Sequence, residues 1–283
     1  MKNKHSLKLI NLSLVAVAMT AGSALAGTEV APAAPASVAE DVISASLSLS
    51  GNSHFISYGK DVWADGSSMS SLEFNPMLEF AFKLPENFTL TLGTWWDVTA
   101  KGDQIPGYPG LGADIYEIDL WSGLSYTYDK FTIGATYQAW CYGDNVENIV
   151  DIKLAYDCLL SPSLVFHNRV SEGASGGDTG TVAVLGLSHT IEAGPLSISF
   201  PVNFAANLTD DYNRYNVNGG SSAGYAYTSA GTQLSYPLAF LGDTYGKWNL
   251  NAGIVQYWTS GAVIPVNPIN NFLTYNFGLS AAF

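Results

Sequence analysis

Charged residues are scarce in this chain. They make up 12% of the sequence, while aromatic residues make up 13%. Soluble domains usually carry roughly 25% charged residues. A surface that met water on all sides would need more charge, so the composition argues against an ordinary soluble domain and favours an exterior that lies largely in lipid.

Basic residues are fewer still, and long apolar runs are missing from most of the chain. The chain has 11 Lys and Arg and 24 Asp and Glu, so its net charge is −13. This negative charge excludes a nucleic-acid partner because phosphates would be repelled. Beyond the first 26 residues no stretch reaches the ~20 apolar residues of a spanning helix. Of only two cysteines, Cys141 and Cys158 fall at opposite ends of neighbouring predicted strands, beyond the ~7 Å Cα limit for a disulfide.

The first residues have the pattern of a secretory signal peptide. Lys2, Lys4 and Lys8 precede an apolar run from Leu9 to Met19, and Ser-Ala-Leu-Ala at 23–26 supplies a cleavage site. We therefore predict a signal peptide at 1–26, a disordered periplasmic lead-in rich in Ala and Pro at 27–41, and one folded unit at 42–283. Removal of the three Lys leaves 8 basic against 24 acidic residues, or −16.

The folded unit consists of short segments in which apolar and polar residues alternate. The last one, "NNFLTYNFGLSAAF" at 270–283, has a large apolar residue at nearly every odd position. Alternation of this kind predicts strands with one apolar face, and segments of about ten residues between turns are typical of membrane barrels. We predict an all-β, closed, antiparallel up-and-down transmembrane barrel of about 12 strands, at 44–58, 69–83, 88–101, 114–128, 130–143, 147–157, 162–172, 180–192, 195–207, 224–238, 247–260 and 271–283.

The same parity predicts two belts of lipid-facing aromatics, as expected at the two membrane interfaces. The periplasmic belt comprises Phe82, Phe88, Tyr126, Tyr128, Phe131, Tyr156, Tyr236, Trp248 and Phe283, and the outer belt comprises Phe55, Trp96, Tyr116, Tyr137, Phe204 and Trp258. Short turns belong at the periplasmic end and long loops at the outer end. The connection 239–246 is long for a periplasmic turn. We expect the chain in the bacterial outer membrane, in contact with lipid and lipopolysaccharide.

The opposite parity predicts the barrel interior. Its charged and aromatic candidates, which would line a pore, are Glu73, Glu79, Trp95, Asp97, Glu117, Asp119, Trp121, Asp151, Lys153, His167 and Arg169. Acids outnumber bases, so an open interior would pass small polar solutes and prefer cations. The selective patch would be Glu117, Asp119 and Trp121 facing Trp95 and Asp97. Alternatively, these charges pair and fill a structural or adhesive barrel that does not conduct.

An enzyme and a metal protein are the other classes to consider. Outer-membrane lipid hydrolases activate a Ser with a His, and the best such cluster here is His54 with Ser50 and Asn52, which lacks a clear triad. The acidic outer loops lack the ligand spacing of a calcium loop. We therefore expect no catalytic residues, metal or cofactor.

Two stretches resemble known sequences. A C-terminal Phe that ends an alternating strand resembles the signal by which the barrel-assembly machinery recognises its substrates, and Tyr275, Phe277, Leu279 and Phe283 would form it. Gly93-Thr94-Trp95, followed by Glu117-Ile118-Asp119, resembles the TorF-type porins, although Trp121 stands where that family has Tyr and 52–61 lacks the family's Arg. That resemblance implies a small porin without specifying its solute.

Overall fold

A computed structural model describes residues 42–69, 72–101, 111, 114–143, 145–172, 177–214 and 220–283. The predicted signal peptide and the lead-in lie outside these residues. None of the helices in the described ranges is long and apolar enough to span a membrane.

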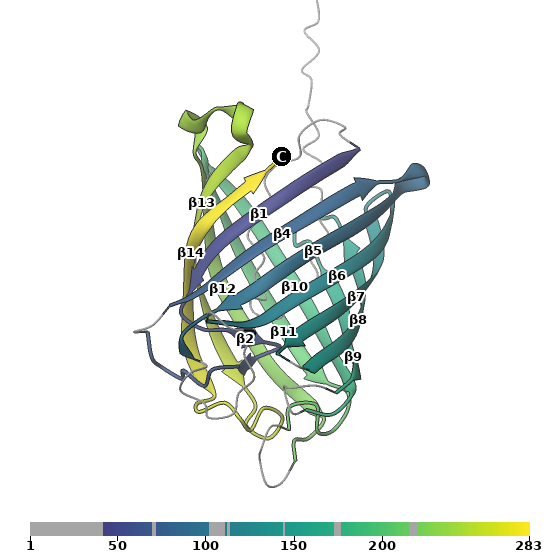
Figure 1. Cartoon of the computed structure of the whole chain (residues 1–283), viewed down its shortest axis with the longest axis vertical. Helices are drawn as coiled ribbons and strands as arrows, with labels where there is room; N and C mark the ends of the chain where they lie inside the picture. Colours follow the sequence, from purple (N-terminus) through teal and green to yellow (C-terminus); the bar gives the residue numbers. More distant parts are fainter. Residues whose placement is uncertain are drawn as a thin grey trace, which may run out of the picture.

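Twelve antiparallel strands close into a barrel, which confirms the predicted fold (Figure 1). Each strand pairs with its neighbours in sequence, and β1 closes the barrel against β14, with Leu49 opposite Leu279. The barrel strands are β1 (Ile43–Asn52), β4 (Glu73–Lys83), β5 (Phe88–Val98), β6 (Ile115–Tyr128), β7 (Phe131–Tyr142), β8 (Asn145–Tyr156), β9 (Ser163–Ser171), β10 (Gly180–Ala193), β11 (Leu196–Asn207), β12 (Gly224–Pro237), β13 (Lys247–Thr259) and β14 (Asn271–Ala282).

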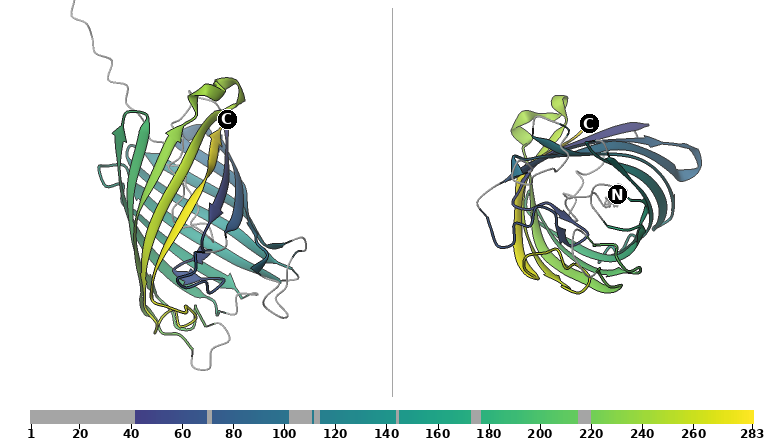
Figure 2. Two further views of the ribbon diagram at one scale, coloured as in Figure 1. Left: turned by 90° about the vertical axis from the view of Figure 1, so that its left-hand side faces the viewer. Right: turned by 60° about the horizontal axis from the view of Figure 1, so that its bottom comes forward.

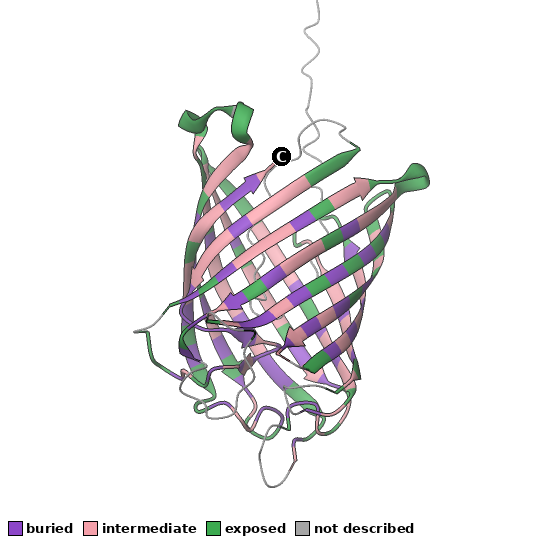
Figure 3. Cartoon of the chain, in the orientation of Figure 1, coloured by how far each residue is buried: buried purple, intermediate pink, exposed green. Residues whose placement is uncertain are grey.

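Exposure alternates along the strands, as the period of two requires (Figure 3). On β6, Glu117, Asp119 and Trp121 are buried, while Leu120 and Leu124 between and beyond them are exposed. Outward side chains are predominantly apolar, while the inward ones include polar, small and aromatic residues. A closed barrel also leaves no unpaired strand edge, which is required where no water is present.

The outer aromatic belt is correct at four positions and wrong at two. Trp96, Tyr137, Phe204 and Trp258 are exposed on the outer face, but Phe55 is only 1% exposed and Tyr116 only 7%. The register of β5 against β6 shifts between Asp97 and Val98. Because a one-residue shift reverses the direction of a side chain, Tyr116 joins the interior.

The predicted first strand, 44–58, is also wrong at its outer end. β1 ends at Asn52, and the chain then folds into the barrel as a hairpin of β2 (Ile56–Ser57) and β3 (Lys60–Asp61), visible inside the wall in Figures 1 and 2. Tyr58 and Gly59 at its tip have φ values of 49° and 80°. Two central residues with positive φ define the tight turn preferred by hairpins. We call residues 53–68 the inward hairpin.

Candidate functional site

The inward hairpin is the centre of an aromatic core within the barrel. The Phe55 ring lies 5.0 Å from the Trp95 ring, and Tyr58 stacks on His167 with ring centroids 3.7 Å apart. Trp63 meets the Tyr116 ring edge-on at 5.4 Å. The hairpin is therefore seated on strands β5, β6 and β9 by close apolar contact.

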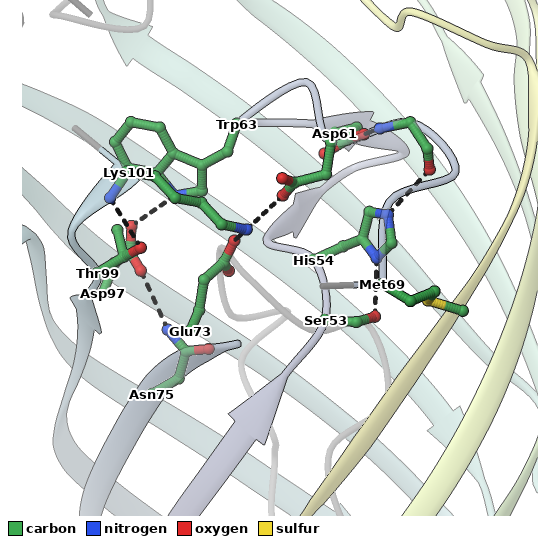
Figure 4. A network of polar contacts seen from close by, with 12 residues as sticks. Ser53, His54, Asp61, Trp63, Met69, Glu73, Asn75, Asp97, Thr99 and Lys101 are labelled. Carbon is green, nitrogen blue, oxygen red and sulfur yellow. Dashed lines mark hydrogen bonds and ion pairs between the residues drawn. The ribbon is translucent and has the colours of Figure 1, made fainter. Parts of the chain in front are cut away.

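The hairpin is anchored on one side by the charged network drawn in Figure 4. Lys101, just beyond β5, binds Asp65 of the hairpin at 2.5 Å and Glu73 of β4 at 2.7 Å. The Trp63 indole nitrogen donates to Asp97 at 2.9 Å. Burial alone would lower the pKa of Lys101, but the two adjacent carboxylates raise it overall. Lys101 therefore stays charged and joins the hairpin to the wall.

The tip of the hairpin carries a second cation toward the opposite side. Burial is the main cause that lowers the pKa of Lys60 to about 8, and Arg169 on β9 lowers it further. Glu147 on β8 and Glu117 on β6 act in the opposite direction. The Arg169 Nε donates to Glu147 at 3.1 Å, so one buried ion pair lies beside this lysine.

Asn267, in the loop between β13 and β14, holds the hairpin from the third side. Its side-chain oxygen accepts from the Asp61 N–H at 2.8 Å, and its amide nitrogen donates to the Gly59 carbonyl at 2.8 Å. Gly59 is required at this point for two reasons. Its φ is positive, and a Cβ would come within 2.3 Å of the Tyr227 ring.

The residues predicted to line a pore all lie on inward-facing positions. Trp95 is opposite Asp119 and Asp97 is opposite Glu117, so the proposed patch is brought together. Asp119 is 0% exposed, and its carboxyl group is in hydrogen-bonding contact with that of Glu117. Their part in a pore stays a prediction. The full set comprises Glu73, Glu79, Trp95, Asp97, Glu117, Asp119, Trp121, Asp151, Lys153, His167 and Arg169.

Most of these residues already have protein partners. The Trp121 indole donates to Glu79 at 3.0 Å, His167 Nδ1 lies 2.8 Å from Asp151, and Glu147 pairs with Arg169 as described. These contacts pair many of the inward polar side chains with one another; whether they close the interior stays open between the two alternatives.

Sequence reasoning missed Lys60, Asp61, Glu147 and Asn267. Lys60 and Asp61 fell in the predicted outer loop 59–68, and Asn267 fell in the predicted outer loop 261–270. The sequence signal that could have revealed the hairpin is Tyr58-Gly59, because a glycine that interrupts an alternating segment is also consistent with a hairpin turn.

The predicted cluster of His54 with Ser50 and Asn52 is not formed: Ser50 and Asn52 hydrogen-bond to Asn75 and to each other, and Ser53 contacts His54 instead. Ser53 Oγ lies 2.7 Å from His54 Nδ1, and His54 Nε2 lies 2.9 Å from the Gly66 carbonyl oxygen. The two side chains are 1% and 2% exposed. Both side chains point into the interior and not toward lipid. Their contacts within the inward hairpin give His54 a structural role. Among the described residues there is also no group of three metal-ligating side chains.

The residues of the predicted insertion signal lie on β14 and just after it. Phe277 and Phe283 are exposed on the outer face. Trp248 of β13 packs edge-on against Phe283 at 6.4 Å. Recognition by the assembly machinery remains a prediction.

The closed barrel, its apolar outer face and its belt of exposed aromatic side chains define a bacterial outer-membrane β-barrel protein. No protein-family profile and no curated protein matches the chain. Solved structures do: the KdgM porin has a TM-score of 0.45 and 12% identity over 84% of this chain and 99% of its own.

Two other kinds of barrel are also similar. Outer membrane phospholipase A from Escherichia coli has a TM-score of 0.39 and 14% identity over 84% of this chain and 92% of that one. A Rh. blastica porin has a TM-score of 0.33 and 12% identity over 74% and 55%. Because a porin and a phospholipase match at similar levels, neither activity is transferred to this chain.

Proposed function

We propose that this protein is an outer-membrane channel for small polar solutes that prefers cations, with the inward hairpin narrowing its outer half. The observation that carries the proposal is the excess of carboxylates on the inner wall. The described inward acids are Glu73, Glu79, Asp97, Glu117, Asp119, Glu147 and Asp151, against Lys101, Lys153 and Arg169 on the wall and Lys60 on the hairpin. Fixed carboxylates attract cations and repel anions.

Small side chains in the periplasmic half of the interior support a passage. Gly123 and Gly134 face inward on β6 and β7, and Ser46 and Ser48 do so on β1. The large inward aromatic side chains lie mainly around the hairpin, including Trp95, Trp140, Tyr227 and Tyr257. Removal of the hairpin would therefore remove the centre of the obstruction, while the aromatic, acidic and small side chains of the wall strands remain.

A non-conducting structural barrel is the second candidate, and the packing of the hairpin favours it. Phe55, Ile56 and Tyr58 are almost fully buried, as in the core of a soluble domain. If the hairpin never leaves, the outer half of the barrel is a folded core.

The finer identity of the protein is part of this proposal. The match at Gly93-Thr94-Trp95 and Glu117-Ile118-Asp119 is the support for a TorF-type porin. Lipopolysaccharide and the barrel-assembly machinery follow as partners from the lipid-facing exterior and the C-terminal Phe283. The KdgM porin has been solved with oligogalacturonate. That solute is anionic, so we do not extend it to this acidic interior.

Planar-bilayer conductance tests the proposal. The wild type is compared with a variant in which residues 55–67 are replaced by a short Gly-Ser linker. In that deletion background, Glu117→Gln with Asp119→Asn removes the central charge. The matched control, Asp157→Asn with Glu192→Gln, removes two carboxylates from exposed positions at the periplasmic end.

We expect larger discrete conductance steps in the deletion variant and a reversal potential that shows cation preference. The Glu117 and Asp119 substitutions should reduce this preference, while the control should leave it near that of the deletion variant. A deletion variant that inserts as a folded barrel but stays electrically silent refutes the channel and leaves the structural barrel.

A further inference from the structure

The connection between β12 and β13 differs from the other turns at the periplasmic end. It runs from Leu238 to Gly246 and is longer than any of the other four described there. Phe240 is 81% exposed, Tyr245 73% and Leu241 41%. The β8–β9 turn also exposes two leucines and the β4–β5 turn exposes Leu84, but none of the other four turns contains an aromatic residue.

This turn has a defined conformation that does not bury its apolar side chains. The Leu241 N–H donates to the Leu238 carbonyl at 3.0 Å, and the Gly242 N–H donates to Ala239 at 3.2 Å. These bonds form the short 3₁₀ turn Ala239–Leu241, and a second 3₁₀ turn follows at Asp243–Tyr245. The backbone therefore holds Phe240 and Leu241 out from the protein instead of folding them inward.

The base of the turn is fastened to the periplasmic aromatic belt. The Trp248 indole donates to the Tyr245 carbonyl at 2.8 Å, and the same indole meets the Phe283 ring edge-on. Gly246 lies against this ring, since a Cβ there would come within 2.7 Å of it. The exposed apolar surface of the turn is thus continuous with side chains that already face lipid.

The turn projects beyond the ends of β12 and β13 in Figure 1, and in the right-hand view of Figure 2 it lies outside the ring of strands. We propose that the 238–246 turn lies in the phospholipid leaflet that faces the periplasm, as a lateral anchor beside the barrel. Its occupant is lipid because the surface extends the lipid-facing belt, and because Tyr and Trp prefer the membrane interface, where one end of the ring is apolar and the other is hydrated. The inference is independent of conduction.

Lipid-borne quenching of a site-specific fluorophore tests the anchor. Cys141 and Cys158 are replaced by Ser, and single cysteines are introduced by Phe240→Cys or Tyr245→Cys. Each is labelled with a polarity-sensitive dye in full-length barrels reconstituted into phospholipid vesicles. The water-facing control is Glu86→Cys, in the β4–β5 turn at the same end of the barrel. The lipid-facing control is Leu250→Cys, on the outer face of β13.

We expect quenchers on the upper acyl chain to reduce the emission at Phe240→Cys and Tyr245→Cys severalfold more than at Glu86→Cys, and iodide to do the reverse. Labels at both turn positions that behave like Glu86→Cys, in barrels shown to be folded by heat-modifiable migration, overturn the proposal. That outcome would leave a water-exposed apolar surface suited to a periplasmic protein.

Discussion

Removal of the Asn267 side chain is the sharpest test of how the inward hairpin is held. Asn267→Ala eliminates one hydrogen bond from the Asp61 N–H and one to the Gly59 carbonyl, each 2.8 Å long. It also eliminates a weaker contact with Thr259 at 3.3 Å. A buried backbone group that loses its partner costs about 1–3 kcal/mol. When water compensates in part, the loss of two such groups costs about 3 kcal/mol of the free energy that holds the hairpin inside the barrel. This corresponds to about a 100-fold increase in the population in which the hairpin has left this position, which we call the unseated state.

Amide hydrogen exchange measured by mass spectrometry on reconstituted protein reports this population. Exchange through local opening follows the free energy of that opening. We expect peptides that cover residues 53–68 to exchange about 100-fold faster in Asn267→Ala, with the barrel strands unchanged. Asn249→Ala is the matched control, because Asn249 is also an inward-facing asparagine but lies at the periplasmic end of β13. If Asn267→Ala leaves the exchange of the hairpin amides at the wild-type rate, the hairpin is held by other contacts, and the role that we assign to Asn267 is refuted.

Three further predictions concern charge and assembly. The pKa of Lys60 is 10.5 when the hairpin is unseated and about 8 when it is seated. Because the unseated state binds more protons between these values, protection of the hairpin amides from exchange should rise from pH 8 to pH 10.5, at most tenfold per pH unit. Lys60→Met should abolish this rise. Replacement of Arg169 by Met removes the buried Arg169–Glu147 ion pair and should lower the free energy of unfolding by about 3–5 kcal/mol, measured by urea titration, while Arg169→Met with Glu147→Met should recover most of it. Deletion of Phe283 should reduce the fraction of heat-modifiable, folded barrel in outer membranes if the residue belongs to the insertion signal, and an unchanged fraction contradicts that role.

The barrel could be predicted from the sequence because its signals are local. Each strand has its own alternation of apolar and polar residues. Trp96 and Trp258 both fall on the lipid-facing side of a strand near its outer end, as the outer aromatic belt requires. The inward hairpin could not be recognised in this way. Asn52, His54 and Ile56 continue the alternation of β1, and this pattern is the same whether the segment continues along the wall or turns into the interior.

The remaining errors arise from long-range contacts. Tyr116 faces inward because a register shift occurs opposite it, between Asp97 and Val98 on β5. Nothing in the local sequence marks that position. Asn267 likewise gains its role only when a loop more than 200 residues away in sequence meets the hairpin, as the separation of 206 between Asp61 and Asn267 shows. Such pairings depend on closure of the whole barrel.

The charged interior and the apolar hairpin have opposite effects on the seated state. Apolar contacts such as Phe55 on Trp95 favour seating, because they remove ring surface from water. Asp119 is fully buried beside the Glu117 carboxyl group, so its negative charge is costly in the seated state, where water is excluded and the neighbouring group is also acidic. It follows that Asp119→Asn should seat the hairpin more firmly even as it reduces cation preference. In the full-length protein both effects lower cation conductance and cannot be separated. In the variant that lacks residues 55–67 only the effect on cation preference remains, so selectivity must be measured in that variant. The difference between the effects of Asp119→Asn in the full-length protein and in the deletion variant gives the contribution of this carboxylate to hairpin seating.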